Sequence, residues 1–413
     1  MGLGEWEVFK EDGGSFAPTI LLGLLPVHSR PEQSGGALRH GSWHERTHRA
    51  ERGRGGEVEV PRRAGPGPMR FLIYGTGAVG AYLGGRLAEA GHAVTFLARP
   101  ATAAALLDRG LRIEQGDSSA TVRGFEVLTG LPEDLDLGPE AAVLLTVRAF
   151  DCEAAAVALH QRLSRPASVV CLLNGIGNEE TLAQSVGVDL VVPATLTTAV
   201  EVRAPGVIRI ERERGLGLAR SRVGEVLAKV FRRAGVVTRL YDDAAAMKWS
   251  KVPTNIVANA GSAVLEWTAG AVMAHPGLYR LEVEALRETF RVMRRAGHRP
   301  VDLPGVPLRW LAPGVFLPPW ASQPWLRRAV ARGRGDKRPS FHRDLGRGRS
   351  EVQWLNGAVV QYGEGLGVPT PANRVLLTAM LERVDGTDDP AAWRHRPDRL
   401  LERAREAGVP GIG

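Results

Sequence analysis

Short apolar runs alternate with helical stretches through the first half of the chain. An apolar run at residues 69–74 enters a glycine-rich turn, an Ala- and Leu-rich stretch follows as far as Gly91, and a second apolar run covers 93–98. This order predicts a strand, a helix and a strand, which is one βαβ unit. The alternation continues, with strands expected at 141–147, 168–173, 207–210 and 236–240 and a helix at 152–163. The pattern predicts an α/β domain built on a largely parallel sheet.

The turn after the first expected strand has the sequence Gly-Thr-Gly-Ala-Val-Gly at 75–80. In such a G-x-G-x-x-G turn the first glycine permits a tight bend, the second lets the backbone approach a pyrophosphate, and the third lets the helix pack on the strand. A glycine turn without a ligand is the plain alternative, and the strand before and helix after argue against it. We therefore expect a dinucleotide to be bound by Gly75, Thr76, Gly77, Ala78, Val79 and Gly80.

The second expected strand is followed by Arg99. Dinucleotide-binding domains that use NAD place an acidic residue here, on the ribose 2′-hydroxyl, whereas a guanidinium can bind a 2′-phosphate. Arg99 therefore predicts NADPH in preference to NADH. The alternative is an ordinary surface arginine in an arginine-rich chain.

Beyond Asp242 the pattern changes to long helical periodicities without a strand signal. We place a domain boundary near residue 240. The fold class expected is an α/β N-terminal Rossmann-type dinucleotide-binding domain, at 69–240, followed by an all-α C-terminal domain, at 241–390, and a tail at 391–413. Residues 1–68 lack hydrophobic periodicity, so we expect them to be a disordered leader or the product of a start site assigned too far upstream.

Lys251, Asn255 and Asn259 recur at intervals of four within an apolar stretch. If that stretch is helical, all three project from nearly one face. Lysine is scarce here, because the 53 Lys and Arg residues include only five lysines, which are Lys10, Lys229, Lys248, Lys251 and Lys337. A lysine can release a proton when burial lowers its pKa, and an arginine cannot. Lys251 is therefore a candidate general acid, with a snorkelling surface lysine as the alternative.

Composition excludes several classes of protein. The chain has 413 residues, 44% hydrophobic, with a formal net charge of +8, and it contains no apolar stretch long enough to cross a membrane. Its only cysteines, Cys152 and Cys171, support neither a disulfide scaffold nor a zinc site, and the histidines lack metal-ligand spacing. The arginines are not interleaved with aromatic residues as in a nucleic-acid module. We expect a cytoplasmic protein with no metal and no nucleic-acid or membrane partner, and a homodimer stays open.

Two polar residues, Arg148 and Asn174, directly follow the strands expected at 141–147 and 168–173. The carboxyl ends of parallel strands line the ligand crevice of an α/β sheet, so both are candidate site residues. An Asn-Gly turn and a solvated arginine explain them equally well from position alone.

Five motifs in this order resemble the 2-dehydropantoate 2-reductase (ketopantoate reductase) family, over a span from Met69 to about Val384. They are GTGAVG at 75–80, LLNGIGNEE at 172–180, PATLTTAVEVRAPGVIR at 193–209, KWSKVPTNIVANAGSAV at 248–264 and RPSFHRDLGRGRSEVQWLNGAVV at 338–360. The resemblance implies that the glycine turn binds NADPH and that Lys251 donates the proton. It also implies that Asn255, Asn259 and Ser340 bind the substrate.

The same resemblance assigns residues between cofactor and substrate. Asn174 is implied to contact both, Glu351 to lie against the nicotinamide ribose, the lysine and the substrate, and Val200 to approach the cofactor through its backbone. Arg148 stands where the family commonly has a cofactor-side lysine. Ala269 replaces an asparagine that many members use for substrate, and the Pro-, Trp- and Arg-rich stretch at 299–337 is longer than a minimal member needs.

The expected function is NADPH-dependent reduction of a 2-oxo acid, with ketopantoate and (R)-pantoate as the substrate and product that the resemblance implies, in pantothenate and coenzyme A biosynthesis. Three alternatives stay open. One is an NADP-linked reductase of a different 2-oxo acid or hydroxyacid, because the departures concern the substrate more than the chemistry. Another is a non-catalytic NADPH-binding regulator, and the last, which the composition disfavours, is an arginine-driven nucleic-acid binder.

Overall fold

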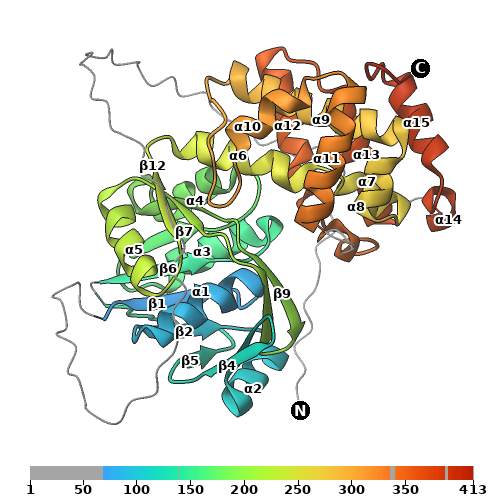
Figure 1. Ribbon diagram of the computed structural model, residues 1–413. Coiled ribbons are helices and arrows are strands. Elements are labelled where there is room, and N and C mark those ends of the chain that lie inside the picture. Colours follow the sequence, from blue (N-terminus) through green and yellow to red (C-terminus); the bar gives the residue numbers. More distant parts are fainter. Residues whose placement is uncertain (1–67, 139, 335–339, 387–388, 413) are drawn as a thin grey trace, which may run out of the picture. The chain divides into compact units, whose positions relative to one another are not determined.

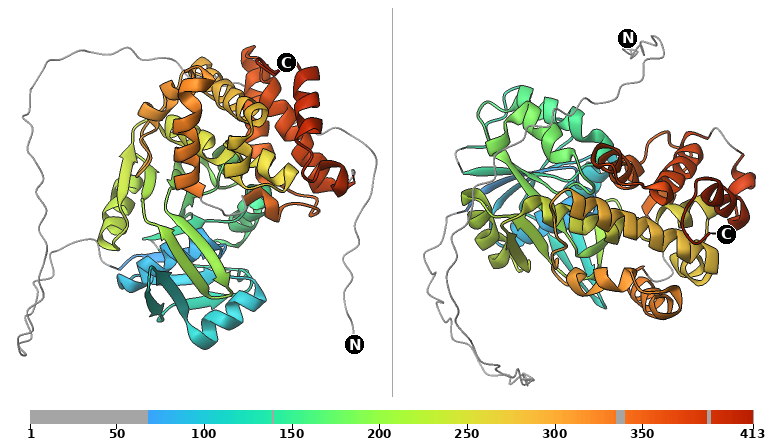
Figure 2. Two further views of the ribbon diagram at one scale, coloured as in Figure 1. Left: turned by 45° about the vertical axis from the view of Figure 1, so that its right-hand side comes forward. Right: turned by 90° about the horizontal axis from the view of Figure 1, so that it is seen from above.

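The computed structural model describes residues 68–138, 140–334, 340–386 and 389–412. Within them, strands and covering helices occupy the sequence up to Tyr241, drawn from blue to yellow-green in Figure 1, and helices occupy nearly all of the rest, drawn from yellow to red. The views in Figure 2 show the same two groups of elements. The predicted fold class is confirmed. The leader expected at 1–68 lies, except for Pro68, outside the described residues.

The described part of the α/β region contains an eight-stranded sheet in the order β12-β11-β8-β7-β6-β1-β2-β5. Its strands are β1 (Arg70–Tyr74), β2 (Ala93–Leu97), β5 (Glu126–Leu128), β6 (Ala141–Leu145), β7 (Ser168–Cys171), β8 (Val191–Leu196), β11 (Leu216–Ala219) and β12 (Thr238–Tyr241). β1 pairs in parallel with β2 on one side and β6 on the other, and only the β8–β11 pairing is antiparallel. The chain changes direction across the sheet between β1 and β6, which is where such sheets bind ligands.

Helices cover both faces of this sheet because successive strand residues point to opposite sides. Phe71 and Ile73 of β1 share a core with α1 (Ala78–Glu89) and α5 (Arg222–Arg233), whereas Leu72 packs with α3 (Cys152–Arg162) and α4 (Asn178–Val186). The helix α2 (Pro100–Arg109) follows β2. The nearly continuous apolar strands are what two covered faces require.

A second sheet has the order β4-β3-β10-β9. Its strands are β3 (Leu111–Gln115), β4 (Ser118–Val122), β9 (Ala199–Ala204) and β10 (Val207–Arg212). Of these, the hydrophobic pattern indicated only β10. Four of the five β4 positions are exposed, so that strand has no apolar alternation to recognise.

The helical region begins with α6, which two residues separate from the end of β12. It consists of α6 (Ala244–Ile256), α7 (Ala260–Leu265), α8 (Ala269–Ala274), α9 (Pro276–Arg295), α10 (Leu308–Val315), α11 (Pro319–Arg334), α12 (Asn356–Leu366), α13 (Pro371–Asp385), α14 (Pro390–Trp393) and α15 (Pro397–Glu406). The long helix α9 is buried along most of its length, from Leu278 to Met293, and supplies the centre of one large core. Each shorter helix contributes an apolar face to that core.

The helical region continues beyond residue 390. The segment described as a tail, 391–413, includes most of α14 and all of α15, and Trp393, Leu400 and Ala404 are fully buried in the helical core. Leu400 and Ala404 lie four residues apart, which places them on one helix face. In the stretch at 299–337, Trp310 and Trp320 are each 81% exposed, so both lie on the surface.

Candidate functional site

The glycine turn joins β1 to α1 with the geometry that a close helix and strand need. Gly75 has a φ of 104°, which favours glycine, and a Cβ at Gly80 would lie 2.2 Å from the carbonyl oxygen of Gly75. A Cβ at Gly77 would meet no protein atom within 4 Å. Protein packing therefore explains glycine at 75 and 80 but not at 77. The open backbone at Gly77 and the start of α1 at Ala78 fit a phosphate-bearing cofactor.

Arg99 lies directly beyond β2, beside this turn. The Leu97 carbonyl oxygen accepts hydrogen bonds from the Gly75 N–H (3.3 Å) and the Thr76 hydroxyl (3.0 Å), which fastens the end of β2 to the turn. Arg99 is exposed and is the N-cap residue of α2. Its position at the end of β2 is the one that the sequence indicated. Val200 lies half-buried on β9, in register with Ile210.

Lys251, Asn255 and Asn259 do not lie on one helix, so that expectation is wrong. Lys251 and Asn255 are on α6, which ends at Ile256, whereas Asn259 is the N-cap residue of α7. Between them Ala258 has a positive φ of 47°, and its N–H donates to the buried Glu282 carboxylate at 2.7 Å. That carboxylate gives the backbone a partner outside the helix, which lets α6 end here.

A continuous row of hydrogen bonds nevertheless joins the polar residues that the sequence indicated for substrate. We call Asn174, Asn255, Asn259 and Ser340 the amide row. Asn255 Nδ2 donates to Asn174 Oδ1 at 3.1 Å, and Asn259 Nδ2 donates both to the Asn255 carbonyl oxygen at 2.9 Å and to Ser340 Oγ at 3.1 Å. The row therefore brings together three segments of the chain. Lys251 is half-buried and lies one helical turn before Asn255, on the same side of α6.

Arg148 and Glu351 meet at the carboxyl end of β6, together with Asp344, which the sequence did not indicate. Arg148 Nη2 lies 2.8 and 2.9 Å from the two oxygens of Asp344, and its Nε lies 3.1 Å from Glu351 Oε2. Glu351 is buried, and burial raises its pKa, although Arg148 and the Ala149 N–H oppose the shift. The guanidinium is thus engaged with two carboxylates while its side chain stays 32% exposed.

The turn that carries Asn174 packs against the short helix that carries Glu351, η4 (Glu351–Trp354). The Ile176 N–H donates to the Trp354 carbonyl oxygen at 3.0 Å. Gly175 has a φ of 93°, and a Cβ there would lie 2.4 Å from that same oxygen. Glycine is therefore required for Asn174 and Glu351 to lie on adjoining elements.

Lys248 and Glu179 form a buried ion pair that the sequence reading missed. Lys248 Nζ lies 2.8 Å from Glu179 Oε1 and donates to the carbonyl oxygens of Leu173 at 2.7 Å and Ala194 at 3.3 Å. Burial alone would lower the pKa of Lys248, but Glu179 reverses that effect and raises it. The scarcity of lysine could have indicated this residue as well as Lys251. The pair fixes α6 to the strand end that precedes Asn174.

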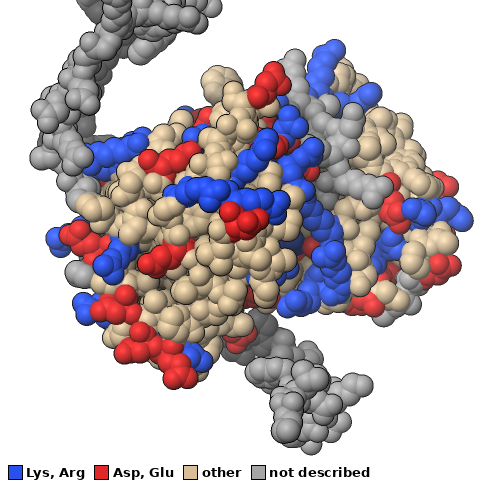
Figure 3. Space-filling model, turned by 90° about the horizontal axis from the view of Figure 1, so that it is seen from below, with Lys and Arg blue, Asp and Glu red and all other residues tan. Residues whose placement is uncertain are grey.

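The charge on the surface is uneven. Figure 3 shows Lys and Arg side chains gathered in a band across the middle of one face, with most Asp and Glu side chains nearer its edges. A band of one sign attracts anionic ligands. Within the described residues, no group of His, Cys, Asp or Glu side chains could hold a metal ion, and no helix is long and apolar enough to span a membrane.

A largely parallel sheet with helices on both faces and a glycine turn at its switch point, followed by a helical domain that adds polar side chains, defines a two-domain protein of the dinucleotide-binding class. The family models for ketopantoate reductase PanE/ApbA match residues 71–220, and for its C-terminal domain residues 243–383. The chain belongs to this family of oxidoreductases.

Individual relatives agree with that assignment. A 2-dehydropantoate 2-reductase of Archaeoglobus fulgidus is 32% identical over 75% of this chain and 96% of its own length, and one of Halobacterium salinarum is 31% identical over 75% and 96%. Among solved structures, a PanE/ApbA family ketopantoate reductase from Ralstonia eutropha is 30% identical with a TM-score of 0.64, over 77% of this chain and 99% of that one. A D-mandelate dehydrogenase with NADH and anilino(oxo)acetate, 18% identical with a TM-score of 0.64, shares the fold.

Proposed function

We propose that this protein reduces ketopantoate to (R)-pantoate with NADPH, with Lys251 as the proton donor, as a step of pantothenate and coenzyme A biosynthesis. The observation that carries the proposal is the amide row, which lies one helical turn from Lys251 in a member of the ketopantoate reductase family. The names of the relatives support the same substrate.

The chemistry assigned to Lys251 follows from where charge develops. NADPH, when bound, supplies the hydride that reduces C2 of the 2-oxo acid. Negative charge then builds on the carbonyl oxygen, and the Lys251 ammonium stabilises it and supplies the proton. Arginine would stabilise the charge but would not release a proton near neutral pH.

The amide row is proposed to orient the substrate. Amide N–H and hydroxyl groups donate hydrogen bonds to carboxylate and hydroxyl oxygens, and Asn174, Asn255, Asn259 and Ser340 supply such groups along one line. Because the row is fixed before substrate arrives, little side-chain freedom is lost on binding.

Glu351 and Arg148 are proposed to act at the junction of cofactor and substrate. Arg148 holds the Glu351 carboxylate through an Nε to Oε2 distance of 3.1 Å, and Glu351 begins the short helix against which the Asn174 turn packs. We propose that Glu351, held in this way, orients the cofactor ribose and the lysine. On the cofactor side, the residues from Gly75 to Gly80, Arg99, Asn174 and Val200 are proposed to bind NADPH, with Arg99 on the 2′-phosphate.

The proposal is tested by NADPH oxidation with ketopantoate beside a panel of other 2-oxo acids, each repeated with NADH. We expect the highest kcat/KM for ketopantoate and NADPH. Faster turnover of another 2-oxo acid would establish the alternative reductase, and tight NADPH binding without any turnover would establish the non-catalytic regulator. A homodimer stays a prediction, to be measured by light scattering.

A further inference from the structure

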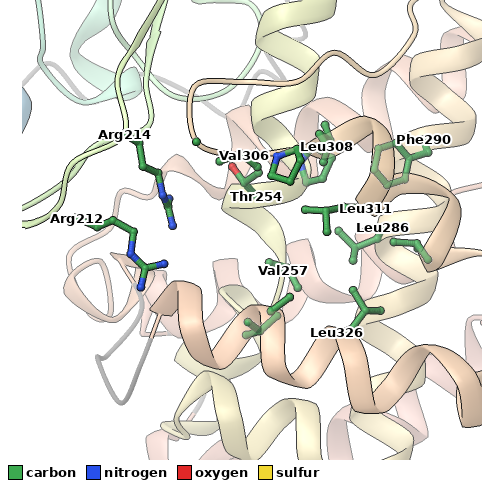
Figure 4. Close-up of a pocket in the computed structure, with 16 residues that line it drawn as sticks. Arg212, Arg214, Thr254, Val257, Leu286, Phe290, Val306, Leu308, Leu311 and Leu326 are labelled. Carbon is green, nitrogen blue, oxygen red and sulfur yellow. The ribbon is translucent and has the colours of Figure 1, made fainter. Parts of the chain in front are cut away.

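The stretch at 299–337, longer than a minimal family member needs, helps to form a pocket. Helices α10 and α11 of that stretch enclose a cavity of about 250 Å³ together with α6 and α9. Most of its lining is aliphatic or aromatic, including Leu286, Phe290, Leu311, Leu326 and Val330. Figure 4 shows apolar side chains such as Leu286, Phe290 and Leu326 on one side of the cavity and two arginines on the other.

The two arginines are Arg212, at the end of β10, and Arg214, two residues further on. Among the described residues neither has an acidic partner: Arg214 Nη1 donates to the Thr197 carbonyl oxygen at 3.4 Å, and the intervening Glu213 accepts hydrogen bonds from Tyr82 and Gln115 instead. Burial and then the nearby positive charge of Arg212 lower the pKa of Arg214. An anion between the two guanidiniums would relieve this repulsion.

The apolar cavity and the two arginines are together complementary to one kind of ligand. We propose that this pocket binds an amphipathic monocarboxylate, with its apolar body between α9, α10 and α11 and its carboxylate on Arg212 and Arg214. An apolar cavity of about 150 Å³ is large enough for benzene, so this larger one has room for roughly six to ten carbon atoms. An apolar wall with a few convergent polar groups is the usual form of a small-molecule site.

This site is distinct from the one proposed for reduction. Pro253 and Thr254 of α6 and Val257, directly after it, line the pocket, whereas Lys251 and Asn255 do not. At 3.6 residues per turn, the middle of the pocket-lining face of α6 lies roughly 130° around the helix from Lys251 and Asn255. The two ligands would therefore occupy different sides of one helix.

The test is calorimetric titration of the full chain with sodium octanoate. We expect saturable binding of one octanoate per chain, binding at least tenfold weaker for butyrate, which buries fewer methylenes, and weaker binding of neutral 1-octanol. Saturating ketopantoate should leave octanoate affinity unchanged. Competition between the two would overturn the separate site, and so would equal affinity for octanoate and 1-octanol.

Variants locate the binding. Ala329→Phe fills the pocket from its α11 wall and should abolish octanoate binding, and the double variant Arg212→Gln/Arg214→Gln should weaken it at least tenfold. Arg328→Gln, an exposed arginine of α11 that does not line this pocket, is the matched control and should bind as wild type does. Circular dichroism checks that each variant is folded. Wild-type affinity in folded Ala329→Phe, or in the folded double variant, would refute the proposal.

Discussion

The glycine turn and the amide row are assembled in opposite ways. Residues 75–80 follow one another along the chain, and their arrangement depends on the positive φ of Gly75 and on the close approach of Gly80 to the Gly75 carbonyl oxygen. The amide row draws on residues 174, 255, 259 and 340, and each neighbour comes from a different element. A local element needs only its own backbone conformation, whereas the row also needs distant helices to pack in register. We therefore expect the row to be the more sensitive of the two to remote changes.

The largest effect is expected from Lys251→Ala, which leaves the glycine turn and the amide row in place. Because the ammonium acts on charge that develops in the transition state, kcat should fall about 10²–10⁴-fold while NADPH affinity and folding stay near wild type. Lys251→Arg should recover little activity. Steady-state kinetics and a fluorescence titration with NADPH measure both quantities. Near-normal turnover of Lys251→Ala would exclude the lysine from the chemistry.

Lys248→Met should disturb the packing that supports the amide row. The change leaves the Glu179 carboxylate without its partner in a largely buried position and removes the hydrogen bond to the Leu173 carbonyl oxygen, one residue before Asn174. We expect the free energy of unfolding to fall by about 3 kcal/mol, measured in urea. The exposed lysine of α5 gives the control, Lys229→Met, which should stay within about 0.5 kcal/mol of wild type. Equal stability of the two variants would show that the buried pair contributes nothing.

Two alanine substitutions in the glycine turn separate the effect of protein packing from the effect of cofactor binding. Gly80→Ala places a Cβ 2.2 Å from the Gly75 carbonyl oxygen and 2.6 Å from Thr146 Oγ1, so it should cost about 1–3 kcal/mol of stability as well as NADPH affinity. Gly77→Ala meets no protein atom within 4 Å, so it should lower NADPH affinity with a much smaller change in stability. Thermal unfolding and NADPH titration distinguish the two. Unchanged NADPH affinity in Gly77→Ala would show that the cofactor does not bind at this turn.

The smallest effect is expected from Arg99→Asp. A carboxylate at the N-terminus of α2 would repel the 2′-phosphate, so the ratio of NADPH to NADH efficiency should fall about tenfold, which corresponds to ~1.4 kcal/mol. Arg109→Asp, at the other end of the same helix, is the control and should leave the ratio unchanged. An unchanged ratio of NADPH to NADH efficiency in Arg99→Asp would show that another group binds the 2′-phosphate.

The sequence predicted the local features well because their rules are local. The strand, glycine turn and helix at 70–89 follow from hydrophobic period and glycine spacing, and so does the sheet's largely parallel order. The end of α6 could not be foreseen in the same way. It depends on Glu282, which lies 24 residues further along the chain and accepts the Ala258 N–H, and no periodicity at 251–259 reports that contact.

The ion pairs show the same limit. Arg148 and Glu351 were both indicated as site residues, but their contact joins positions 203 residues apart, and Asp344, which binds the same guanidinium, was not indicated. Lys248 and Lys251 lie on the same helix, but only Lys248 lies on its buried face. Which face is buried depends on where α6 packs. Strand β4 was missed because its exposed side chains carry no apolar signal.

The direction of the hydrogen bonds in the amide row has a chemical consequence. Asn174 accepts a hydrogen bond through Oδ1, so its Nδ2 amino group does not take part in the row. Ser340 accepts a hydrogen bond through Oγ, so its hydroxyl proton can be donated to a group outside the row. Both ends of the row therefore present hydrogen-bond donors. For the substrate that we propose to bind along the row, this favours oxygen atoms with lone pairs at either end over groups that can only donate hydrogen bonds.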